Sequence, residues 1–379
     1  NEKFKQNAID NGCKNIIDSS ELKNHIDLSS IKIIGITGTN GKTTTAAAIY
    51  SILLDLGYKV ALQGTRGFFI NEQRVEDYSL TTPVQLGNFA HIQKAMQNGC
   101  DFFVMEVSSH AIEQKRIEGL TFALKIHTNI TRDHLDYHKT IEEYINVKNS
   151  FLSDESPKLI NKDDSKVKCN TKNGFAYSLE NPSTYKVTAY SFKNGMHVMF
   201  NHFGAIHSFS SNMMGIFNVY NLMAAVAAVH ITTNKPLEEI CEALEGFGGV
   251  SGRMETVSEN PLIIVDFAHT PDGMKEVLQS FNERDIICVF GAGGDRDKEK
   301  RPLMGSIAAS YAKHIIVTSD NPRFEDPDMI IEDILKGIKN HSSVIVELNR
   351  KEAIRKAIEK ADENSVVLVL GKGDESTQI

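Results

Sequence analysis

A glycine-rich segment between a predicted strand and a predicted helix restricts the fold of this chain more than any other feature. Residues 32–36 are rich in β-branched side chains, which predicts a buried strand. Residues 43–56 repeat apolar side chains at helical spacing and precede Gly57, which predicts a helix with a glycine cap. The segment at 35–44 reads GITGTNGKTT. Such a loop directs backbone N–H groups and a helix N-terminus at an anion, so the sequence predicts a polyphosphate site in an α/β fold.

The side chains of this loop suit a nucleotide and a metal ion. Lys42 supplies a positive charge at the β- and γ-phosphates, and the hydroxyl after the lysine, on Thr43, is a Mg²⁺ ligand in loops of this type. The strict GxxxxGK[ST] pattern is not met, because Ile36 replaces its first glycine, and a plain glycine-rich turn is the alternative. Glu106 lies near the end of an apolar strand, where its carboxylate suits either the metal site or a structural ion pair. Residues 129–138 add several possible ligands and a base, and their spacing does not indicate which of them bind.

The composition excludes several other classes of protein. The 379 residues carry 41 Lys and Arg against 49 Asp and Glu, a net charge of −8, which argues against a nucleic-acid partner. No apolar run approaches the roughly 20 residues that cross a bilayer. The five cysteines form no CxxC pair, which disfavours a disulfide framework or a zinc site and indicates a reducing cytoplasm. The first residue is Asn1 and no secretion signal follows it, so we expect a piece of a longer protein.

The order of the predicted elements indicates two α/β bodies. Strands and helices alternate from residue 31, as in a parallel sheet covered by helices. Between residues 173 and 210 the pattern changes, and the Asn194-Gly195 step predicts a hairpin in an antiparallel subsheet. A glycine cluster at 246–252 marks a boundary. Strands predicted near 262–266, 286–290, 314–318, 343–347 and 366–370 then describe an open Rossmann-like sheet. We therefore predict a P-loop parallel-sheet ATPase domain at 31–246 and a Rossmann-like domain at 247–379.

Six motifs in this order resemble the Mur ligases, the ATP-dependent amide-bond-forming enzymes of peptidoglycan synthesis. They lie at residues 35–44, 106–111, 128–138, 218–221, 251–255 and 266–272. Segments 81–83, 293–298 and 320–323 further resemble the MurE type, which adds the third peptide residue. Arg323 in the last segment implies meso-diaminopimelate as the amino acid. Residues 1–30 resemble the tail of the family's N-terminal uridine-nucleotide domain.

The resemblance implies a role for each matching residue. The positions on ATP are Gly38, Thr39, Asn40, Gly41, Lys42, Thr43, Thr44, Asn218, Arg253 and Asp266. Those on the UDP-N-acetylmuramoyl dipeptide are Thr81, Thr82, Ser108, Gln114 and Arg116. Those on diaminopimelate are Arg296, Asp320, Asn321, Pro322, Arg323, Gly371 and Glu375, next to Asp374, which replaces the histidine of relatives. The implied Mg²⁺ ligands are Thr43, Glu106, His134 and a carbamylated Lys148. The implied catalytic residues are Lys42, His134 and Lys148.

The implied reaction is ligation through an acyl phosphate, followed by attack of the diaminopimelate amine. A base must keep this amine neutral, and His134 and His269 are both candidates. The alternatives are a lysine-adding homologue, a ligase like folylpolyglutamate synthetase, and a nucleotide-dependent binding module that does not ligate. A dinucleotide site at 291–296 is disfavoured because Arg296 stands where that motif needs glycine or alanine. We further expect a monomer that binds neither nucleic acid nor membrane.

Overall fold

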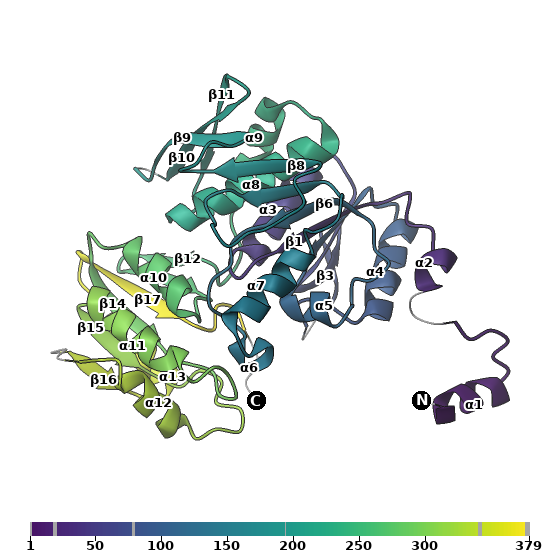
Figure 1. Cartoon of the computed structure of the whole chain (residues 1–379). Coiled ribbons are helices and arrows are strands. Elements are labelled where there is room, and N and C mark those ends of the chain that lie inside the picture. The colour runs from purple at the N-terminus through teal and green to yellow at the C-terminus, as the bar shows by residue number, and fades with distance from the viewer. Residues whose placement is uncertain (1, 18–20, 78–79, 194, 340–342, 376–379) are drawn as a thin grey trace.

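Two β-sheets, each covered by helices, make up this protein (Figure 1). The computed structural model describes residues 2–17, 21–77, 80–193, 195–339 and 343–375. The first sheet has the strand order β11-β10-β9-β8-β7-β6-β1-β5-β2-β3-β4. Its strands are β1 (Lys32–Thr37), β2 (Val60–Gly64), β3 (Gly67–Ile70), β4 (Gln73–Glu76), β5 (Phe102–Glu106), β6 (Phe122–His127), β7 (Lys158–Asn161), β8 (Gly174–Ser178), β9 (Tyr185–Ser191), β10 (Met196–His202) and β11 (Ala205–Ser211).

Helices pack on both faces of the first sheet. On one face lie α3 (Lys42–Asp55), α8 (Ile216–Thr233) and α9 (Leu237–Glu245), whose apolar side chains form one core with the strands. On the other face, α4 (Gln85–Gln97) closes a second core together with Phe151 and Leu152, which follow α7 (Ile141–Ser150). The remaining helices before β12 are α1 (Glu2–Asp10), α2 (Leu22–His25), α5 (Ser109–Glu113) and α6 (Leu135–His138). Among the described residues, α8 alone is long and apolar enough to cross a membrane, and it is largely buried as the core helix of this body.

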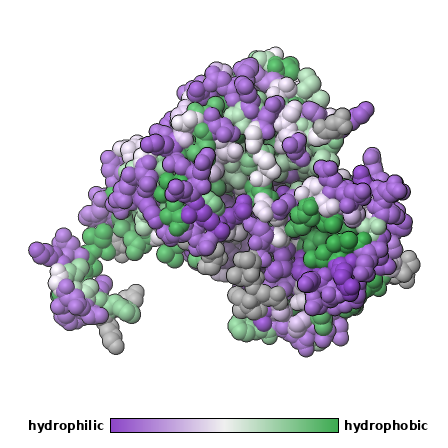
Figure 2. Space-filling view, turned by 180° about the vertical axis from the view of Figure 1, so that it is seen from behind, coloured by the Kyte–Doolittle hydropathy of each residue, from purple (hydrophilic) through white to green (hydrophobic). Residues whose placement is uncertain are grey.

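The second sheet has the order β12-β13-β17-β14-β15-β16 and is parallel except for the β12–β13 pair. Its strands are β12 (Glu255–Glu259), β13 (Leu262–Asp266), β14 (Asp285–Phe290), β15 (His314–Val317), β16 (Val344–Val346) and β17 (Ser365–Leu370). One face is covered by α10 (Pro271–Gln279), α11 (Lys300–Tyr311) and α12 (Pro327–Leu335), and the other by α13 (Arg350–Glu359). The space-filling view shows a mostly hydrophilic surface, with an apolar area on this second body at the right (Figure 2).

The predicted fold class is confirmed, and one of its details is wrong. The pairs β9–β10 and β10–β11 are antiparallel, as the predicted subsheet requires, although Asn194 itself lies outside the described residues. The strand β8 instead pairs in parallel with β7 and β9, so the antiparallel strands continue the main sheet. An asparagine–glycine step specifies only its own turn. The strands that pair with β8, and their direction, depend on packing between segments distant in the chain, so a local sequence pattern does not predict them.

Candidate functional site

A single cavity of about 630 Å³ lies where the two bodies meet, and both contribute to its walls. From the first body it is lined mainly by residues at or after the ends of β1, β2, β5, β6 and β7, and by the start of α8. From the second body it is lined mainly by residues at or after the ends of β13, β14, β15 and β17. In open parallel sheets, ligands bind beyond the carboxyl ends of the strands. Here two such edges face each other across one cavity.

The glycine-rich loop leaves room for backbone alone at two points. A Cβ atom on Gly38 would lie 1.8 Å from the Thr128 hydroxyl, and one on Gly41 would lie 2.2 Å from the Asn221 carboxamide oxygen. Gly41 also has φ +85° and caps the N-terminus of α3. Lys42 Nζ donates to the carbonyls of Gly38 and Thr39 at 2.9 and 2.8 Å. Residues 39–44 all line the cavity, so the loop presents the start of α3 to it, as an anion site requires.

A hydroxyl and a carboxylate meet at the base of this loop. Thr43 Oγ1 donates to Glu106 Oε2 at 3.0 Å, and the backbone N–H of Thr65 donates to Glu106 Oε1 at 2.9 Å. Glu106 is almost fully buried but lines the cavity. No group of three or more His, Cys, Asp or Glu side chains with metal-binding geometry occurs in the described part of the chain. One buried carboxylate and one hydroxyl nevertheless suit Mg²⁺, which usually takes few protein ligands and completes its shell with phosphate and water.

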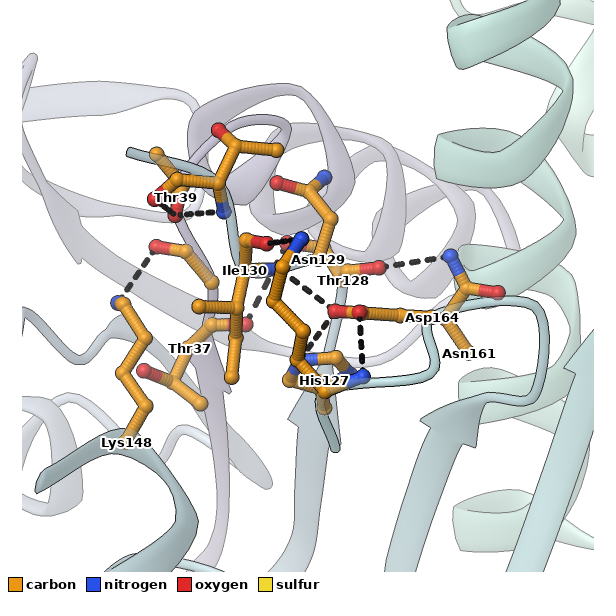
Figure 3. Close-up of polar contacts among 12 residues, drawn as sticks. Thr37, Thr39, His127, Thr128, Asn129, Ile130, Lys148, Asn161 and Asp164 are labelled. Carbon is orange, nitrogen blue, oxygen red and sulfur yellow. Dashed lines mark hydrogen bonds and ion pairs between the residues drawn. The ribbon is translucent and has the colours of Figure 1, made fainter. Parts of the chain in front are cut away.

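Lys148 lies beneath the loop rather than in the wall of the cavity. It is 1% exposed, and its Nζ donates to Gly38 O at 2.8 Å from α7 (Figure 3). Burial lowers the pKa of Lys148 well below its usual value, and the charge of Lys42 lowers it further against the opposing Asp133. A buried lysine of this kind holds a neutral amine far more readily than an exposed one.

His127 lies in the same buried layer, with Asp164 at 3.4 Å from its Nε2 (Figure 3). Within the described part of the chain, neither ring nitrogen of His127 has a hydrogen-bond partner by geometry. Burial, aided by the charge of Lys148, lowers the pKa of His127 to about 3, so the ring is neutral at pH 7.

The two candidate bases share one electrostatic environment. His134 lines the cavity and its Nε2 is 3.3 Å from Asp133 Oδ2, while His269 lies on the opposite wall and bonds Phe267 O at 2.9 Å. Burial lowers the pKa of each imidazole to about 4, with Asp133 opposing the shift in both. Lys300, which pattern reading did not single out, also lines the cavity, and its pKa is lowered by burial against Asp133. Both histidines are therefore neutral at pH 7, and geometry does not separate them as bases.

Three further residues assigned to ATP by resemblance, outside the glycine-rich loop, also line the cavity: Asn218, Arg253 and Asp266. Asn218 is buried at the start of α8, donates to Met214 O and accepts from Asn221. Asp266 accepts from the backbone N–H groups of Met254 and Ala268 at 2.8 and 2.7 Å. The Arg253 guanidinium lies 4.0 Å from the centre of the Phe267 ring. Both Asn218 and Asp266 thus already have bonds within the protein.

Of the residues assigned to the sugar dipeptide, only Thr81 lines the cavity. Thr82 is fully buried, donates to Glu106 O and accepts from the backbone N–H of Ser108. Arg116 donates to Thr82 O at 2.8 Å and to the Gln114 side chain. Thr82, Ser108, Gln114 and Arg116 therefore form one connected cluster beside the cavity, and Thr82 acts in it as a structural link.

The residues assigned to diaminopimelate gather in the second body. Those that line the cavity are Arg296, Asp320, Asn321, Arg323, Gly371 and Glu375, whereas Pro322 does not. Gly371 has φ +112°, and a Cβ there would lie 2.5 Å from Asp320 Oδ2. Arg323 has the left-handed φ of +49° and donates to Gly294 O at 2.7 Å. An arginine fork and two carboxylates thus face the phosphate loop across the cavity.

Ion pairs that sequence reasoning missed join the two bodies at the rim. Arg132, two residues before His134, lies 3.2 Å from Asp297 and 2.6 Å from Glu299. Arg66 pairs with Asp374 at 3.1 Å. Charged residues in loops gave no signal that distinguished these pairs from solvated surface charge.

Comparisons with known proteins agree with this arrangement. Residues 36–229 match the Mur ligase middle domain, and residues 252–373 match the Mur ligase glutamate ligase domain. This chain belongs to the Mur ligase family. A UDP-N-acetylmuramoyl-L-alanyl-D-glutamate–2,6-diaminopimelate ligase of Wolinella succinogenes is 56% identical over 372 residues, which is 98% of this chain and 86% of that protein. The enzyme of the same name from Helicobacter pylori is 51% identical, over 96% and 83%.

Solved structures resemble this Mur ligase along most of its length. A structure of a UDP-N-acetylmuramoyl-L-alanyl-D-glutamate–2,6-diaminopimelate ligase has a TM-score of 0.66 at 31% identity, covering 95% of this chain and 77% of that one. The folylpolyglutamate synthase of Mycobacterium tuberculosis has a TM-score of 0.75 at 16% identity, covering 93% and 91%. At that identity the second likeness concerns the fold alone.

Proposed function

We propose that this Mur ligase joins meso-diaminopimelate to the D-glutamyl carboxylate of UDP-N-acetylmuramoyl-L-alanyl-D-glutamate at the expense of ATP. One observation carries the proposal: the phosphate loop and Arg323 line the same cavity. A γ-phosphoryl donor and an amino acid with a distal carboxylate can therefore approach one acceptor carboxylate. The names of the relatives, one of them 56% identical, support the same reaction.

In the proposed reaction the acceptor carboxylate takes the γ-phosphoryl group, giving an acyl phosphate and ADP. The amine of diaminopimelate then attacks the acyl carbon, phosphate leaves, and the amide forms. Lys42 and the N-terminus of α3 offset the negative charge of the phosphates, and catalysis consists largely of positioning and charge neutralisation. The neutral imidazole of His134 or His269 accepts the proton of the attacking amine.

We further propose that Thr43 and Glu106 hold Mg²⁺, which would neutralise charge on the transferring group. His134 and a carbamate on Lys148 are proposed as further ligands. The low pKa of the buried Lys148 supports this, because only a neutral amine captures CO₂. We also propose a cytoplasmic monomer with domains at 31–246 and 247–379, which light scattering and limited proteolysis would test.

The purified protein would be assayed for phosphate release and for the mass of the product. With ATP, Mg²⁺, the UDP-linked dipeptide and meso-diaminopimelate, we expect phosphate and a UDP-linked tripeptide. L-Lysine in place of diaminopimelate should turn over at least tenfold less efficiently. Turnover with a folate and glutamate, but none with the dipeptide, would refute the proposal, as would ATP binding without any amide product.

A further inference from the structure

The two loops that carry the proposed diaminopimelate residues meet face to face with no space between them. Gly294 donates its N–H to Asn321 O at 2.9 Å and accepts from Arg323 Nη1 at 2.7 Å. A Cβ on Gly294 would lie 1.9 Å from Pro322 O. Because Arg323 bonds a backbone carbonyl of the opposite loop, the direction of its guanidinium depends on the separation of the two loops.

An ion pair between a buried arginine and a partly buried glutamate lies directly behind this junction. Arg301, at 0% exposure, reaches Glu325 through Nη1 at 3.1 Å and Nη2 at 2.8 Å. Glu325 Oε1 also accepts the backbone N–H of Asp295 at 2.6 Å. Glu325 belongs to the Arg323 loop and Asp295 to the Gly294 loop. One carboxylate therefore ties both loops to a buried arginine of α11.

Each loop contains one non-glycine residue with a positive φ, a backbone conformation that side chains with a Cβ atom disfavour. Asp295 and Arg323 have φ values of +50° and +49°, in the left-handed region. Such residues persist only where the surroundings hold them in place. The carboxylate of Asp295 accepts from the N–H of Phe324 at 3.2 Å, which is a further tie between the loops. In the Arg301–Glu325 pair the arginine is fully buried and the Glu325 side chain is 14% exposed. Charge-assisted bidentate bonds such as these are stronger than bonds between neutral groups, so this pair is the strongest of the ties.

We propose that Arg301 and Glu325 are positioning residues that set Arg323 for the distal carboxylate of the amino-acid substrate, and so determine the preference for diaminopimelate over lysine. The inference rests on the proposed function. Neither residue lines the cavity, so they act through Arg323 rather than on the substrate. Lysine lacks the distal carboxylate, so misplacing Arg323 weakens the use of diaminopimelate and leaves the use of lysine nearly unchanged.

The chain offers a matched control in Asp333 of α12. Its Oδ2 accepts from the same Arg301 Nη1 at 3.0 Å. Its other contact among the described residues is with Lys336 in the next turn, and it touches neither substrate loop. Asp333→Asn therefore removes a carboxylate from the same arginine without releasing the junction, and it reports the effect of weakening the buried cluster alone.

The experiment measures steady-state phosphate release by the full chain with each amino acid, at saturating ATP and UDP-linked dipeptide. For Glu325→Gln we expect the KM for diaminopimelate to rise at least tenfold, the KM for ATP to stay within twofold, and the ratio of kcat/KM for diaminopimelate over lysine to fall at least tenfold. Arg301→Lys, which cannot bond Glu325 in a bidentate manner, should reproduce this pattern if Glu325→Gln fails to fold. Asp333→Asn should lower the Tm but leave the ratio within twofold.

Two outcomes would overturn the inference while leaving the proposed function intact. In the first, Glu325→Gln and Arg301→Lys both keep the wild-type preference for diaminopimelate over lysine. In the second, Asp333→Asn loses this preference as much as Glu325→Gln does. Wild-type protein that fails to use diaminopimelate at all would overturn the proposed function and this inference together.

Discussion

Lys148 Nζ lies 2.8 Å from the carbonyl oxygen of Gly38, beneath the loop that faces the cavity. The two residues are 110 positions apart in the chain. The amine is buried, its pKa is lowered, and it reaches the rear of the phosphate loop without entering the cavity wall. A carbamate formed on this nitrogen would extend the side chain by one carboxylate-like group.

We therefore expect Lys148→Ala to reduce ligation at least 100-fold, with partial recovery when a short carboxylate such as formate or acetate is added. Lys148→Arg keeps a donor for Gly38 O but cannot form a carbamate, and it should be as inactive as the alanine variant. The measurement is phosphate release, with the exposed Lys162→Ala as control. Activity of Lys148→Arg near the wild-type level would show that the lysine is structural.

Arg323→Ala should raise the KM for diaminopimelate about 10- to 100-fold, equivalent to about 1.4 to 2.8 kcal/mol, which is close to the usual range for a hydrogen bond to a charged group. The KM for ATP should change by less than twofold, because the phosphate loop lies on the opposite wall. Steady-state kinetics with each substrate varied in turn would test this. The control is Arg355→Ala on the exposed face of α13, where both KM values should stay unchanged. Equal changes in the two KM values for Arg323→Ala would contradict the assignment.

Thr43→Val removes a hydroxyl that donates to Glu106 at 3.0 Å while nearly preserving its volume. If this pair holds Mg²⁺, the concentration of Mg²⁺ for half-maximal activity should rise at least tenfold. Glu106→Gln should show the same direction of change. A titration of phosphate release against Mg²⁺ measures it, with Thr188→Val on the first sheet as control. An unchanged Mg²⁺ requirement in both variants would exclude these two residues as the metal site.

The lowered pKa of His127 predicts that the folded protein loses stability in acid. Its folded pKa of about 3 lies below the value of about 6.5 in an unfolded chain, so the unfolded state binds the proton more readily. Its contribution to the free energy of unfolding is complete above about pH 6.5 and is lost as the pH falls toward 3, by up to about 1.4 kcal/mol per pH unit.

The Tm of the wild-type protein should therefore fall between pH 7 and pH 4, and less steeply in His127→Gln, even if that variant is less stable at pH 7. The exposed His197→Gln is the control, since its slope should match that of the wild type. If the Tm of His127→Gln and of the wild type fell with the same slope, His127 would be ruled out as a source of the acid sensitivity.

Much of the fold was predictable because its signals are local. The run from β1 through the loop to α3 needs glycines where the backbone approaches other atoms, and a lysine and threonine at the start of the helix. These requirements involve residues within a segment of ten, so they can be recognised in the amino-acid sequence. The five parallel strands of the second sheet were predicted for the same reason, since each is a short apolar run between helical segments. The antiparallel edge strand β12 was not predicted, because its residues are mostly polar and exposed.

The sequence by itself thus determined many of the elements, the glycine-rich loop between β1 and α3 and, through its motifs, the family. Only the tertiary structure decided that β8 pairs in parallel, that Lys148 lies behind Gly38, and that Arg301 reaches Glu325. These relationships join segments whose separation in the chain carries no periodic signal. They are chosen when apolar faces bury and the remaining buried charges and polar groups must find partners, which is a property of the packed molecule rather than of any single segment.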